Sequence, residues 1–165
     1  MRTIYGYGAA GLVPFVSLSL AAYFGVADAV EGVSSATVLT GMITYGAVIL
    51  SFLAGTLWMN GVRRAVADER PRLDAAYAGW PAIGALWCSA GICLSLSAWA
   101  ALLLAIEARA FGLALAVNGA GFALLLAIEW IQRKTLDYGR GYWRLRCVLS
   151  AVVLLCHALA LASLA

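Results

Sequence analysis

The sequence predicts an all-α fold, a polytopic membrane protein with five transmembrane helices in a single domain, and three observations lead to this prediction. Hydrophobic residues make up 64% of the 165 residues and charged residues only 12%. In soluble domains about 45–50% of the residues are apolar and about 25% are charged. Long apolar runs recur along the chain at the length of about 20 residues that a helix needs to cross a bilayer. Basic residues gather in alternate connections between these runs, which is typical of membrane topology and not of nucleic-acid binding.

We expect the first two helices at residues 7–26 and 37–61. Pro14 lies inside the first, where it removes a backbone donor and favours a kink. This run also resembles a signal peptide, but no small-residue cleavage site ends it, so we expect it to be retained. The second run has no charged residue in 25 and would reach roughly 37 Å at 1.5 Å per residue, enough to cross a hydrocarbon core of about 30 Å.

Three further helices are expected at residues 80–106, 110–131 and 147–165. Trp80 and Pro81 open the third, as an interfacial aromatic residue followed by a proline suited to a first helical turn. A tight turn with Glu107 and Arg109 separates the third from the fourth helix. The connections at 62–79 and before the fifth helix are rich in arginine, and the latter also carries an aromatic belt.

The basic residues predict the orientation of the bundle. Ten of the eleven fall on the side of the amino terminus and of the connections after the second and fourth helices, and only Arg109 falls on the other. Because basic loops stay inside, we expect a cytoplasmic N-terminus and an external C-terminus. The expected location is the cell inner membrane, or the mitochondrial inner membrane in a eukaryote.

Small and hydroxyl-bearing side chains form a stripe along the second helix at steps of three and four residues. The stripe consists of Thr40, Thr44, Ala47, Ser51, Gly55 and Trp58. Transmembrane helices associate by close backbone approach over such residues, so we expect this face to pack against protein. The first helix carries a similar stripe around Pro14, which we predict as its mate, and the third carries another from Gly84 to Ala98.

Three polar residues within the spans are candidates for chemistry, and each has a structural alternative. Glu129 is able to relay protons or bind a cation, or it forms an ion pair with Arg133 one turn later. Asn118 lies on the same helical face and either lines a groove with Glu129 or joins two helices by hydrogen bonds. His157, the single histidine, either ligates haem iron or titrates near neutral pH, or it packs with a hydrogen bond.

Ordinary hydrolytic or group-transfer chemistry has no recognisable set of residues in this sequence. The four cysteines lie in apolar segments without a CxxC pair, and we interpret them as small packing residues. No phosphate-binding glycine loop, zinc signature or nucleophile with a base is found. We therefore expect no enzyme, no catalytic residue, no metal and no cofactor.

Two segments resemble the best-marked motifs of a known family. They are GLVPF, Gly11 to Phe15, and YGAVILSFLAG, Tyr45 to Gly55, followed by Trp58. The chain is similar here to a family of small integral membrane proteins named domain of unknown function 3429, which includes mitochondrial transmembrane protein 69. The family usually has Gly-Gly where Ala54 and Gly55 stand here. The resemblance implies an inner-membrane setting and no established activity.

We expect the protein to act by lateral helix association, as an accessory or assembly subunit of a larger inner-membrane complex, with a respiratory complex as one candidate. Its expected partners are membrane lipids and other transmembrane subunits, and not nucleic acid. The alternative is a small carrier or channel for a proton, a small solute or a lipid, lined by Tyr45, Ser51, Asn118 and Glu129. A third candidate, a haem- or quinone-handling redox protein, depends on His157 and on the many aromatic residues.

Overall fold

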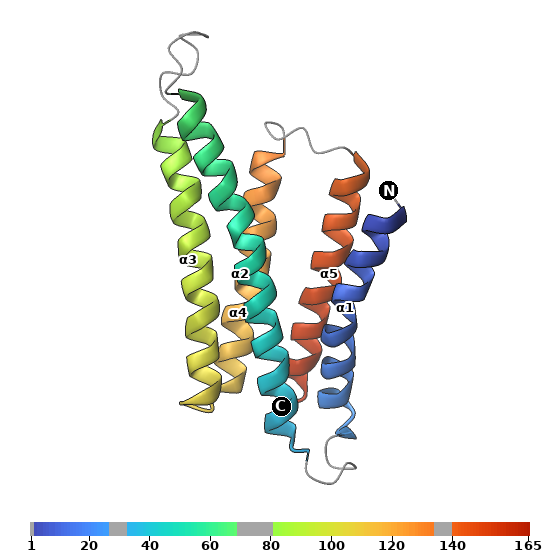
Figure 1. The fold of residues 1–165 in the computed structure, drawn as a ribbon. Helices are drawn as coiled ribbons and strands as arrows, with labels where there is room; N and C mark the ends of the chain where they lie inside the picture. Colours follow the sequence, from blue (N-terminus) through green and yellow to red (C-terminus); the bar gives the residue numbers. More distant parts are fainter. Residues whose placement is uncertain (1, 27–32, 69–80, 134–139) are drawn as a thin grey trace.

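The computed structural model describes residues 2–26, 33–68, 81–133 and 140–165, and this part of the chain forms five α-helices without strands (Figure 1). The helices are α1 (Arg2–Tyr23), α2 (Ser35–Asp68), α3 (Pro81–Ile106), α4 (Phe111–Gln132) and α5 (Arg140–Ala162). Each contains a segment long and apolar enough to cross a membrane. The predicted all-α bundle of five spans is confirmed.

The helices form two groups that meet along α4. In Figure 1, α2 lies beside α3 and α1 lies beside α5, so the first and last helices of the chain are neighbours. The helix α4 contacts α2, α3 and α5. Its buried residues recur at steps of three and four, from Ala114 through Asn118 and Phe122 to Glu129, which gives this helix one face toward the bundle interior.

The tightest packing joins α2 to α3 over small residues. A Cβ atom at Gly61 would lie 2.6 Å from the carbonyl oxygen of Gly84, and one at Gly91 would lie 2.9 Å from that of Ala54. These distances are shorter than atomic contact allows, so glycine lets the two backbones touch. The predicted α3 stripe therefore faces α2.

The stripe predicted on α2 is only partly covered by the chain itself. Ala47 is buried and Ser51 is half-buried, but Thr44, Gly55 and Trp58 are exposed. The residues of α2 that are fully buried in the core lie beside this stripe and include Met42, Leu50, Ala54 and Leu57. Within the chain this face is covered at Ala47 and in part at Thr40 and Ser51. That its exposed residues pack against another protein stays a prediction.

The packing of α1 also differs from the predicted pairing of two small-residue stripes. Pro14 is half-buried and Ser17 is exposed, whereas Phe15 and Ser19 are the buried residues within the part of α1 from residue 6 to residue 23. The helix does contact α2, but through larger side chains, since both Leu18 methyl groups lie 3.9 Å from the position that a Cβ atom would take at Gly41.

Three helices extend well beyond their predicted bounds, and the first of them, α1, begins at Arg2 and not at residue 7. The helix α2 continues to Asp68 and α5 begins at Arg140, seven residues before the predicted start at Cys147. Charged residues were predicted to lie in connections, but arginine is a good helix former. The acidic residues Asp28 and Glu31 and most of the basic connection at 62–79 lie outside the described residues.

Candidate intramembrane polar site

Four helices meet around Phe15, which is only 1% exposed. Its ring centroid lies 5.0 Å from that of Tyr45, 5.8 Å from that of Phe122 and 5.8 Å from that of His157. The contacts with Tyr45 and Phe122 are edge-to-face, the arrangement that the ring quadrupoles favour. We name Phe15, Tyr45, Asn118, Phe122 and His157 the midspan cluster.

A hydrogen bond within this cluster joins the two motif segments. The Tyr45 hydroxyl donates to the carbonyl oxygen of Gly11 at 3.0 Å. Pro14 has no backbone N–H, so the carbonyl of Ala10, the residue before Gly11, lacks its helical donor. The GLVPF segment of α1 and the YGAVILSFLAG segment of α2 are therefore in direct contact in the folded chain.

Asn118 is fully buried and connects α4 to α2. Its Nδ2 donates to the carbonyl oxygen of Ile43 at 3.1 Å. Gly46 provides the space, since a side chain there would collide with the Asn118 amide. Among the described residues the Asn118 Oδ1 atom has no hydrogen-bond partner. Asn118 thus joins two helices by a hydrogen bond, as the second of its two predicted roles requires. Its Oδ1 atom remains an acceptor without a partner among the described residues.

His157 is 2% exposed and packs against Phe15 and Phe122. Its Nδ1 lies 2.8 Å from the carbonyl oxygen of Val153, so Nδ1 carries the proton and Nε2 is the acceptor. Gly119 faces the ring closely, and Nε2 has no partner in the described part of the chain. The described residues contain no group of three or more His, Cys, Asp or Glu side chains that could hold a metal ion.

Glu129 forms a buried ion pair, but its partner is Arg146 of α5 and not Arg133. The Arg146 Nε lies 2.5 Å from Glu129 Oε2, and Nη2 lies 3.1 Å from Oε1, a two-bond geometry. The Arg133 guanidinium instead stacks on the Trp130 ring, 3.1 Å from its centroid. Asn60 extends this polar region to α2 by donating to Gln132 at 3.4 Å.

The predicted candidates therefore fall into two places. Asn118 and His157 join the midspan cluster with Tyr45, whereas Glu129 belongs to the ion pair toward the end of α4. Sequence reasoning missed Phe15 and Arg146. Phe15 is the last residue of the GLVPF motif, so the motif could have identified it as a candidate. Arg146 is one of several arginines in the same segment, and nothing in the sequence distinguishes it from them.

Five apolar helices that bury an ion pair and a polar cluster define a multi-pass helical membrane protein. The sequence model of the family described as Protein of unknown function (DUF3429) matches residues 1–162, so the chain belongs to this family. No curated protein and no solved structure matches the chain.

Proposed function

We propose that the protein is non-enzymatic and acts by lateral helix association, as an accessory or assembly subunit of a larger inner-membrane complex. The observation that carries this proposal is the open glycine surface at the second motif. Gly55 is exposed, and no atom lies within 4 Å of the position that its Cβ would take.

Large side chains border this open surface. Phe52 is 74% exposed, Met59 52% and Trp58 47%, so Gly55 forms a low point between bulky neighbours. Within the chain, the small residues Gly61 and Gly91 close the α2–α3 contact. An exposed glycine flanked by bulky residues offers a second helix the same close approach, and in a bilayer such packing drives association.

Variants at two open glycines test the proposal. Replacing Gly55 by leucine fills the surface without touching the rest of the chain, and Gly6→Leu is the matched control because Gly6 also has no neighbour within 4 Å. At native expression and in mild detergent, we expect the wild type and Gly6→Leu to migrate as one larger complex. Gly55→Leu should release the free subunit. A wild type that purifies alone, or a Gly55→Leu complex of unchanged size, refutes the proposal.

One observation favours the second candidate, a carrier or channel for a proton or small solute. Asn118 Oδ1 and His157 Nε2 are buried acceptors without partners among the described residues. Glu129 is less suited to line a route for protons or solutes, because both of its carboxylate oxygens already accept hydrogen bonds from Arg146. Proteoliposomes that dissipate an imposed pH gradient no faster than empty vesicles would exclude the proton route.

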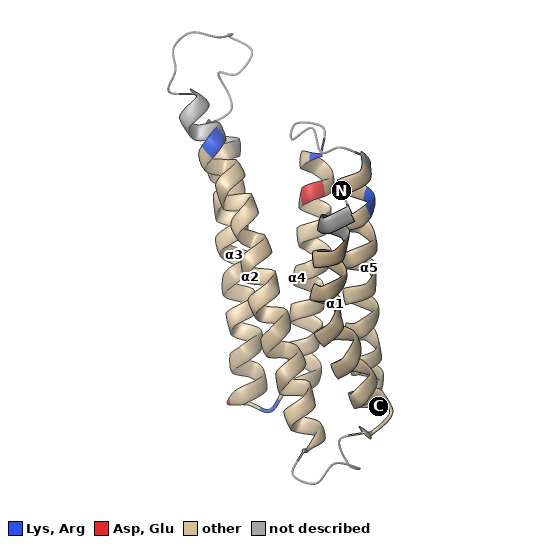
Figure 2. Cartoon of the chain, turned by 45° about the vertical axis from the view of Figure 1, so that its right-hand side comes forward, with Lys and Arg blue, Asp and Glu red and all other residues tan. Residues whose placement is uncertain are grey.

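Arg63, Arg133 and Arg144 lie where α2 and α4 end and α5 begins, and Arg109 lies in the turn after α3. Figure 2 shows basic residues mainly at the end of the bundle where α2 and α4 end, and we infer that this end is inside. The described charges are thus distributed as the positive-inside rule requires. A fluorescent protein that folds only in the cytoplasm should be bright on the N-terminus and dark on the C-terminus. The reverse pattern would refute the inferred orientation.

A further inference from the structure

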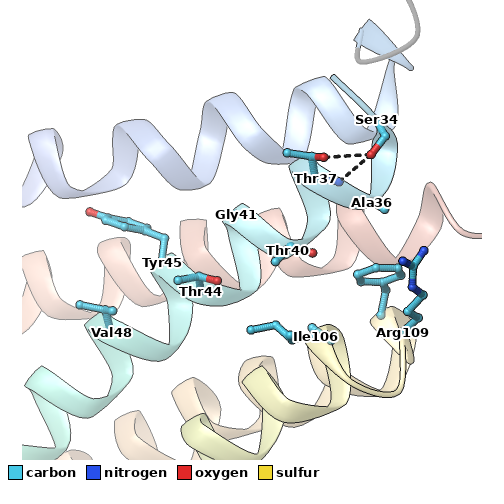
Figure 3. A pocket seen from close by; sticks show the side chains of 12 residues that line it. Ser34, Ala36, Thr37, Thr40, Gly41, Thr44, Tyr45, Val48, Ile106 and Arg109 are labelled. Carbon is cyan, nitrogen blue, oxygen red and sulfur yellow. Dashed lines mark hydrogen bonds between the residues drawn. The ribbon is translucent and has the colours of Figure 1, made fainter. Parts of the chain in front are cut away.

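A groove of about 740 Å³ opens on the bundle at the end where α2 begins and α3 ends (Figure 3). It lies between the first half of α2, the end of α3, the following turn and the first residue of α4. Its volume is within the range of about 300–1,000 Å³ that is common for ligand sites. None of the residues of the midspan cluster lines it except Tyr45.

One end of this groove is polar. Arg109 lines it, together with the hydroxyl-bearing residues Ser34, Thr37 and Thr40. Ser34 caps α2, since its hydroxyl accepts from the Thr37 amide at 3.2 Å. The first turn of a helix carries partial positive charge. The Arg109 side chain is exposed and forms no ion pair with any described residue, and Figure 3 shows it rising from the turn toward the α2 side.

The backbone of Arg109 supports a role for its side chain. Its φ of 50° is the single positive value at a non-glycine residue in the described chain. This left-handed conformation reverses the chain after α3, so that the Ala110 amide donates to the Leu104 carbonyl oxygen at 2.9 Å. Helix ends usually place glycine in such a conformation because other residues are strained there. The chain nevertheless holds a cationic side chain at this point of the groove.

The other end of the groove is apolar and faces into the membrane-spanning part of the bundle. Val48, Tyr45 and Ile106 line it. From Ser34 to Val48 the groove follows α2 for roughly 20 Å at 1.5 Å per residue. Half of a hydrocarbon core of about 30 Å is about 15 Å, so the groove has the depth of one leaflet with its headgroup layer.

We propose that this groove binds one phospholipid with an anionic headgroup from the leaflet at this end of the bundle. The phosphate lies between the Arg109 guanidinium and the first turn of α2, and an acyl chain lies against Tyr45 and Val48. The pairing of a cationic, hydroxyl-rich end with an apolar end matches the chemistry of an anionic lipid along its whole length. A water-soluble anion would use only the polar end.

Native mass spectrometry of the full chain tests the proposal after reconstitution in nanodiscs of phosphatidylglycerol or of phosphatidylcholine. We expect one phosphatidylglycerol retained per chain and little phosphatidylcholine. Arg109→Gln keeps the Cβ and the turn but removes the charge, and should weaken retention about five- to tenfold. Arg63→Gln, which removes a charge at the opposite end of α2, should retain phosphatidylglycerol as the wild type does.

Two further measurements separate the groove from charge alone and from free phosphate. Thr44→Trp fills the groove, because Thr44 is exposed and lines it, and should lose the lipid while keeping Arg109. Inorganic phosphate should not raise the thermal unfolding temperature as phosphatidylglycerol does. Equal retention by Arg109→Gln or Thr44→Trp, or equal stabilisation by inorganic phosphate, would overturn the proposal. Circular dichroism of each variant without added lipid establishes that it is folded.

Discussion

The buried pair of Glu129 and Arg146 gives the sharpest test of how α4 and α5 are held together. Their side chains are 6% and 8% exposed, and two hydrogen bonds join them. Glu129→Gln removes the negative charge but keeps one acceptor, so one of two charge-assisted bonds is lost and Arg146 is left buried without its counter-charge. We expect a loss of about 3 kcal/mol in the free energy of unfolding, near the lower bound for breaking a buried pair.

A double-mutant cycle separates the pair from each residue alone. Arg146→Gln should cost a similar amount, but the double variant should cost about 1–2 kcal/mol, because two neutral amides are able to hydrogen-bond each other. Arg133→Gln is the control, since Arg133 is within one turn of Glu129 but stacks on Trp130, a contact worth about 0.5–1 kcal/mol at an exposed site.

Unfolding in mixed micelles with increasing dodecyl sulfate, followed by tryptophan fluorescence, measures these free energies. Two outcomes would refute the reasoning. If the losses of the single variants simply add in the double variant, the two side chains do not interact. If Arg133→Gln costs as much as Arg146→Gln, Glu129 pairs with Arg133, as its place in the sequence suggested.

Three further predictions use the same unfolding assay. Gly61→Ala should cost about 1–3 kcal/mol, because its methyl group would collide with the α3 backbone, whereas Gly55→Ala should change stability by less than about 0.5 kcal/mol; equal effects would contradict the packing described. Tyr45→Phe keeps the ring but loses the hydrogen bond to Gly11, and should cost about 1 kcal/mol; a neutral result would mean that this bond does not stabilise the bundle. Arg109→Gly should stabilise the lipid-free protein by about 1 kcal/mol by relieving its positive φ, and a destabilised variant would show that the turn is not strained.

The number and type of the helices were predictable because they depend on local properties of the chain. Apolar length and the clustering of charge are visible in a window of about 20 residues, and both follow from what a bilayer excludes. The ends of helices were less predictable. The helix α5 begins at Arg140 because an arginine is able to continue a helix when its charge reaches water or a partner, as Arg146 does through Glu129.

The arrangement of the helices, by contrast, depends on contacts between distant parts of the sequence. The periodicity of α2 revealed a stripe of small residues but not which neighbour would lie against it. The close backbone contacts are made by Gly61 of α2 and Gly91 of α3, whereas Gly55 of α2 has no neighbouring atom within 4 Å of its Cβ position. Likewise, the position of Glu129 indicated a need for a cationic partner, and several arginines could meet it. Only the three-dimensional neighbourhood of α4 and α5 selects Arg146.

The adjacency of α1 and α5 has a consequence for the order in which the bundle is assembled. The helices α2 and α3 follow each other in the chain and share the closest backbone contact, so they are able to pair as soon as both are in the membrane. Phe15 of α1, however, packs against Phe122 of α4 and His157 of α5, which the ribosome makes only after α2 and α3. The helix α1 is therefore locked in place only after α4 and α5 have been made, and until then its buried face is in contact with lipid or with another protein.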